Sequence, residues 1–105
     1  MGISLWLFCP CCQQESDSEG TTHNLTPMWD KAGVKDALYN SDGKAAGETI
    51  AALEAGLADM RAKPEEYRAL NPANGWGDYA GALRFLTAWL ALCKRSPQSI
   101  IVARP

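Results

Sequence analysis

The order of the hydrophobic patterns constrains the fold of this chain more than any other feature. Strand-like runs occur only near the two ends, as Ile3–Phe8 and Ser99–Ala103. The first run is short and aromatic, the profile of a strand that is covered on both faces, and the second is rich in β-branched residues. Helical periodicity fills the middle, most clearly in the apolar residues Ile50, Leu53, Leu57 and Met60.

Thr21–Leu25 predicts a second extended piece that pairs back on the first strand. The two would form a hairpin over residues 1–25, with a mobile, acidic tip over residues 9–20. A closing strand over residues 98–104 then completes one small antiparallel sheet, with helices packed on one face. The sequence therefore predicts an α+β fold in a single domain of residues 1–105.

Three or four helices are expected within residues 26–96. Thr26 and the proline that follows it start the first helix, which is interrupted near Gly33. Pro64 ends a long amphipathic helix and starts a short one, and Asp78 caps the last helix. That helix stops at Ser96, which precedes a proline.

The composition narrows the classes of function. The chain is 47% hydrophobic and 21% charged, with a formal net charge of −2 and scattered basic residues, so a nucleic-acid backbone is not an expected partner. No apolar run reaches the ~18 residues of a membrane span, and the N-terminal run is too short and uncharged for a secretion signal. A cytoplasmic protein is expected. Nucleotide-loop, zinc-protease and hydrolase motifs are absent, which favours a non-enzymatic role.

Four cysteines are the first candidates for chemistry. Cys9, Cys11 and Cys12 are clustered in "CPCC", and Cys93 lies far away on the last predicted helix. With His23, the three clustered cysteines would supply the ligands of a zinc site, although C-x-C-C is tighter than the usual C-x₂₋₄-C spacing. A redox site is the other cysteine-based alternative. Cys93 is expected to be a small core residue.

The segment "TTHNLTPMW" contains a second set of candidates. His23 and Asn24 directly precede a predicted helix start, where free backbone N–H groups favour an anion or a polar ligand. The alternative is structural: Asn24 and Thr26 organise the turn and cap the helix, while His23 pairs with a carbonyl. Trp29 follows on the same helix.

The loop "NPANGWGDY" is the third candidate. Asn74 and Gly75 form a strong turn dipeptide, and Trp76 stands between two glycines. Trp76 can fold back as a lid on the core, or it can stack on a planar ligand or anchor a protein interface. Tyr79 ends the segment and could also stack on a base.

The two segments together resemble a family of small, uncharacterised proteins of bacteriophages and some bacteria. The resemblance rests on "THNLTPMWDKAGV", on "LNPANGWGDYAGALRFL" and on a terminal strand after "CKRSP", and it covers roughly residues 21–104. The positions that match are His23, Asn24, Met28, Asn74, Gly75, Trp76, Gly77 and Tyr79. The "CPCC" tip does not match. The resemblance implies a phage-type accessory protein and no particular activity.

Three functions follow as expectations. The favoured one is a non-enzymatic module that binds a small, nucleotide-like ligand, in which an aromatic ring stacks on the base and a helix N-terminus meets a phosphate. A protein-interaction module or homodimer is the second, and a cysteine-based zinc or redox site is the third. The residues predicted to bind the ligand are His23, Asn24, Trp29, Asn74, Trp76 and Tyr79.

Overall fold

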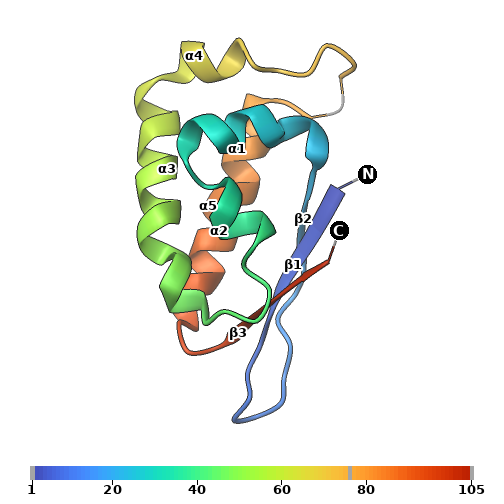
Figure 1. Cartoon of the computed structure of the whole chain (residues 1–105), viewed down its shortest axis with the longest axis vertical. Helices are drawn as coiled ribbons and strands as arrows, with labels where there is room; N and C mark the ends of the chain where they lie inside the picture. The colour runs from blue at the N-terminus through green and yellow to red at the C-terminus, as the bar shows by residue number, and fades with distance from the viewer. Residues whose placement is uncertain (1, 76, 105) are drawn as a thin grey trace.

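A computed structural model of the chain describes residues 2–75 and 77–104. A three-stranded antiparallel sheet lies on one side of the molecule and the helices lie on the other (Figure 1). The strands are β1 (Gly2–Phe8), β2 (Glu19–Thr22) and β3 (Ile100–Arg104), in the order β2-β1-β3. The predicted α+β fold, with the N-terminal hairpin and the C-terminal strand in one sheet, is confirmed.

The helices occupy the chain between β2 and β3. They are α1 (Thr26–Ala32), α2 (Lys35–Tyr39), α3 (Ile50–Ala62), α4 (Pro64–Arg68) and α5 (Tyr79–Arg95), with short 3₁₀ turns at His23–Leu25 and Ala46–Thr49. The predicted interruption near Gly33 is confirmed: this residue has φ +76° and separates α1 from α2. The predicted extended piece is wrong beyond Thr22. The next three residues form the first 3₁₀ turn because the Thr22 side chain accepts from the Asn24 N–H and Thr26 Oγ1 donates to the His23 carbonyl.

The central strand is buried on one face only. Ile3, Leu5 and Leu7 alternate toward the helices and are at most 4% exposed, whereas Trp6 and Phe8 on the opposite face are partly exposed. The prediction that this strand is covered on both faces is therefore wrong within the described chain. Side chains alternate between the faces of a strand, so helices on one side cover only every second residue.

The core lies between the sheet and α5. Trp29 from α1 and Trp89 from α5 are fully buried in one cluster with the inward residues of the strands. Gly56 lets α3 approach the end of α1 closely, because a Cβ at this position would lie 3.0 Å from the Ala32 carbonyl oxygen and would collide with the side chain of Val34, just after α1. This two-layer packing places the hairpin turn between β1 and β2 at one extreme of the molecule (Figure 1).

The free edge of β3 is tied to the segment that precedes α3. The Gly43 N–H donates to the Ile101 carbonyl and the Ile101 N–H donates to the Lys44 carbonyl, both at 2.8 Å. Asp42 accepts from the Ala103 N–H and from the Arg104 guanidinium. Within residues 2–75 and 77–104, no helix is long and apolar enough to cross a membrane.

Candidate functional site

The two segments predicted to bind a ligand meet in the structure. The α-carbon of Gly77, at φ +102°, lies against Thr22 and Leu25, so closely that a Cβ would be 3.0 Å from Thr22 Cγ2. A glycine at this position therefore lets the loop before α5 contact the turn before α1. Trp76 itself lies outside the described residues.

The other two aromatic residues of the predicted ligand site belong to the core. Trp29 is fully buried, with its ring centroid 5.7 Å from that of Phe85. Tyr79 is 7% exposed, and its hydroxyl donates to the Met60 carbonyl at 2.6 Å. In this arrangement neither ring offers a face for a ligand, so Trp29 and Tyr79, both predicted to bind the ligand, pack in the core, and the base stacking predicted for Tyr79 is not possible here.

The polar residues of the predicted ligand site make local hydrogen bonds. His23 Nδ1 lies 3.0 Å from the Tyr39 hydroxyl, and burial raises the pKa of Tyr39. The Asn24 side chain donates to Thr22 Oγ1, so Asn24 organises the turn as the structural alternative expects. That alternative is wrong in its other two parts, because α1 begins without a side-chain cap bond and His23 pairs with a hydroxyl and not with a carbonyl. Asn74 is exposed in its turn.

The predicted four-ligand zinc site is not assembled. Thr22, the neighbour of His23, pairs with Gly2 at one end of β1, whereas Cys9 follows the other end of that strand. Seven residues of strand, at about 3.4 Å each, separate the two ends. No group of three or more His, Cys, Asp or Glu side chains within the described residues could hold a metal ion.

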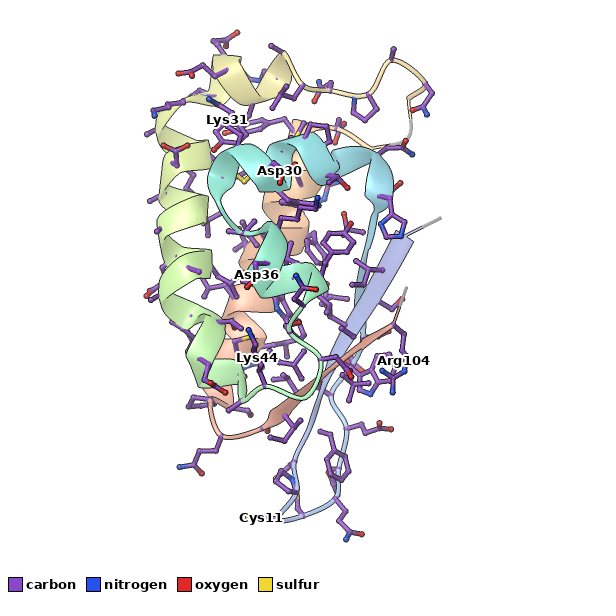
Figure 2. The ribbon with its side chains drawn as sticks, in the orientation of Figure 1. Cys11, Asp30, Lys31, Asp36, Lys44 and Arg104 are labelled. Carbon is purple, nitrogen blue, oxygen red and sulfur yellow. The ribbon has the colours of Figure 1, made fainter. Side chains whose placement is uncertain are left out.

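The cysteine cluster forms the turn of the hairpin. The Cys9 N–H donates to the Gln14 carbonyl at 2.9 Å, and the Gln13 N–H donates to the Cys9 carbonyl at 2.7 Å. Gln13 closes the turn with φ +58°. Figure 2 shows Cys11 at the far end of this turn, away from the body of the protein.

Bonds between the two arms hold this turn in place. Leu7 and Ser16 exchange two hydrogen bonds of 2.8 Å, one through the Ser16 hydroxyl and one through its backbone N–H. The Trp6 indole N–H donates to Glu15 Oε2 at 2.8 Å. The turn is therefore continuous with the sheet, which gives the cysteines a defined geometry.

Hydrogen bonds converge on the sulfur of Cys9. The backbone N–H of Cys12 is the largest influence, followed by the Cys12 thiol and the backbone N–H of Cys11, and together they lower the pKa of Cys9. Such bonds stabilise a thiolate, and the thiolate is the reactive form of cysteine. Cys9 is partly exposed, and Cys11 and Cys12 are exposed.

Two depressions adjoin Cys9. One, of about 350 Å³, separates the turn from the loop between α5 and β3, and its lining includes Cys9, Cys11 and Arg95. The other, of about 260 Å³, adjoins Cys9, Cys12 and Glu15. A larger, open depression of about 790 Å³ lies between β2 and α5, and no cysteine or histidine lines it. The two smaller depressions give a second molecule access to Cys9 from two sides.

The fourth cysteine has the opposite environment. Cys93 is fully buried on α5, and burial raises its pKa to about 11, although Thr49 Oγ1 lies 4.0 Å from its sulfur. All four cysteines are free thiols. The prediction that Cys93 is a core residue is confirmed.

The sequence interpretation missed one pairing within "CPCC". Cys9 and Cys12 alone have C-x-x-C spacing, which is typical of thiol–disulfide chemistry. Grouping three cysteines as one ligand set concealed this pair. No family model, curated protein or solved structure matches the chain.

Proposed function

We propose that the hairpin turn is a thiol–disulfide exchange site in which Cys9 is the nucleophile and Cys12 is the resolving thiol. The observation that carries this proposal is the turn itself, which places the partly exposed Cys9 and the exposed Cys12 at C-x-x-C spacing, with a depression on each side of Cys9. Donors from Cys12 and Cys11 lower the pKa of Cys9 and so favour its thiolate form. Cys12 is also the thiol that attacks Cys9 in the second step of the exchange.

The exchange has two steps. The Cys9 thiolate attacks one sulfur of a disulfide R–S–S–R, which forms a mixed disulfide with Cys9 and releases one RS⁻. The Cys12 thiolate, after loss of its proton to solvent, then attacks the Cys9 sulfur and releases the second RS⁻. The protein loses two hydrogens and becomes a Cys9–Cys12 disulfide, while R–S–S–R is reduced to two thiols.

The surroundings of Cys9 support this chemistry. Attack on a disulfide needs room for both halves of the substrate, and the depressions on the two sides of Cys9 supply it. A reducing compartment, in keeping with the cytoplasmic location expected from the sequence, keeps the pair as a dithiol until a disulfide arrives. The protein then acts as a stoichiometric electron donor.

The proposal is tested with one equivalent of an aromatic disulfide that releases a coloured thiol. The wild-type protein is expected to release two coloured thiols and to lose about 2 Da with no adduct. Cys12→Ser is expected to keep a mixed disulfide at Cys9, because the resolving thiol is missing. Cys93→Ala is the matched control and should behave like the wild type.

A different set of results would contradict the proposal. It fails if the wild-type protein retains the aromatic adduct, or if Cys9→Ser, which keeps only Cys11 and Cys12 in the turn, releases two coloured thiols at an unchanged rate. It also fails if peptide mapping assigns the adduct of Cys12→Ser to Cys11.

Ligand binding by the two converging segments is a second candidate function. The contact of Gly77 with Thr22 and Leu25 favours it, since it brings the loop to the turn that carries His23 and Asn24. A nucleotide panel is expected to raise the melting temperature of the wild-type protein and not that of His23→Ala. The absence of any shift at saturating ligand would remove this candidate.

A further inference from the structure

Half of the outer face of the β1–β3 pair is apolar, unlike the usual outer face of a small antiparallel sheet, whereas Ser4 and Arg104 at the other end are polar and exposed. Trp6 is paired with Val102 and Phe8 with Ile100, and all four side chains are partly exposed on the face opposite the helices. We call these four residues the outer patch. An antiparallel sheet covered by helices on one face normally alternates apolar and polar residues, with the polar ones outward.

The apolar composition of both faces requires an explanation. Trp6 and Phe8 are apolar like Leu5 and Leu7 on the other face of β1, yet the described chain buries Leu5 and Leu7 and leaves Trp6 and Phe8 partly exposed. A contiguous apolar surface patch of more than a few hundred Å² marks a contact with another molecule. The outer patch is therefore only partly covered, although the sequence of the strand predicts that both of its faces are packed.

Charges flank the outer patch at both ends. Arg104 shares the outer face at one end, where it is paired with Asp42 through its Nη1 atom. Glu15 lies at the other end, beside the hairpin turn, and accepts from the Trp6 indole. Figure 2 shows Arg104 on the sheet, away from the turn that carries Cys11.

We infer that the outer patch binds a second copy of this chain, in a symmetric dimer with the two sheets face to face. The two-fold axis lies between the two sheets and reverses the direction of the strands, so that the two outer patches stack on each other. Because Arg104 and Glu15 lie at opposite ends of the patch, this axis places Arg104 of each copy near Glu15 of the other copy. An apolar centre with a cation at one end and an anion at the other is complementary to itself, as a two-fold interface requires. This inference does not depend on the thiol chemistry.

The area of the outer sheet face limits the expected affinity of the dimer. Three strands about 4.8 Å apart and about 3.4 Å per residue give a face on the order of 300 Å². Standard interfaces bury about 800 Å² per partner, so the dimer is expected to be weak and in equilibrium with the monomer. Its detection needs a wide range of protein concentrations.

Sedimentation velocity in the presence of reductant tests the inference, from roughly 5 to 500 µM protein. The wild-type protein is expected to shift from monomer to dimer across this range. Val102→Glu should raise the dissociation constant about tenfold or more, since it places a charge in the centre of the interface. Ala91→Glu, at an exposed position on α5, is the control for an added surface charge and should leave the dissociation constant unchanged.

Two further variants test the pairing of charges. Arg104→Glu and Glu15→Arg should each weaken the dimer, and the double variant should restore it. Val102→Thr, which keeps the shape of the side chain, replaces Val102→Glu if the latter does not fold. A wild-type monomer at every concentration would overturn the inference, as would a loss of the dimer in Ala91→Glu or an additive weakening in the double charge variant.

Discussion

The hairpin turn and the interior of α5 place the same functional group in opposite environments. At the turn, Cys9 is accessible and hydrogen-bond donors lower its pKa. In α5, Cys93 is fully buried and burial raises its pKa to about 11. Desolvation disfavours the charged thiolate, whereas donors that point at the sulfur favour it.

The difference between the two regions separates the cysteine proposed to react, Cys9, from a structural one, Cys93. A thiol in the core behaves as a small apolar residue, and its ionisation is suppressed. Three thiols in a turn cannot contribute to a core, because the turn projects away from it (Figure 1). The thiol chemistry that we propose therefore requires the turn and not the core.

The largest predicted difference is in the rate of modification. In the native protein, a thiol reagent should modify Cys93 slower than the cysteines of the turn by a factor of roughly 10³ or more, because Cys93 reacts only after opening of the structure. Counting modified thiols against time, with and without denaturant, measures this ratio. Four thiols of equal reactivity in the native state would contradict the assignment.

The second prediction concerns stability. Cys93→Ala should lower the free energy of unfolding by about 1–2 kcal/mol, because it leaves a small cavity against Thr49 and the rest of the core. Cys11→Ser, at an exposed position, should change it by less than about 0.5 kcal/mol. Urea denaturation of both variants measures the two effects. A larger loss for Cys11→Ser than for Cys93→Ala would reverse the comparison.

The third prediction is a loss of stability in alkaline solution. The thiol of Cys93 ionises near its usual value of 9.0 in the unfolded chain and at about 11 in the folded protein, so between these values only the unfolded state loses the proton. Stability from this thiol is therefore present below pH 9 and falls above it, by at most about 1.4 kcal/mol per pH unit. The excess slope of the wild-type protein over Cys93→Ala in this window measures the effect, and identical slopes would refute it.

The smallest predicted effect is on the pH profile of the turn. With Cys11 changed to Ser, the rate of Cys9 alkylation should reach half of its maximum below the pH expected for an ordinary thiol. Adding Cys12→Ser removes a thiol donor, so the midpoint should move upward and the rate at pH 7 should fall a few-fold. A midpoint that does not move would mean that Cys12 has no influence on Cys9.

Much of the fold could be predicted because it depends on local patterns. Strand-like runs at the ends, the apolar spacing of α3 and the capping residue Asp78 each indicated an element that the structure contains. The 3₁₀ turn after β2 was missed because side-chain bonds from Thr22 and Thr26, and not periodicity, determine it. The burial of one face of β1 depends on which elements cover the sheet, which no local pattern specifies.

The candidate site could be predicted only in part. The sequence indicated the cysteines and the two polar segments, and the contact of Gly77 with Thr22 brings those segments together. The sequence alone could not show how far His23 lies from Cys9, because this separation depends on the pairing and direction of the strands. The packing of Trp29 and Tyr79 is likewise a property of the whole core. The resemblance to phage accessory proteins stays a prediction.

The most direct test of the central claim is peptide mapping of the wild-type protein after one equivalent of a small disulfide, with remaining thiols blocked under denaturing conditions. The account predicts a Cys9–Cys12 disulfide, with Cys11 and Cys93 recovered as blocked thiols. A disulfide that includes Cys93, or a stable adduct on Cys11 with Cys9 and Cys12 still reduced, would contradict it.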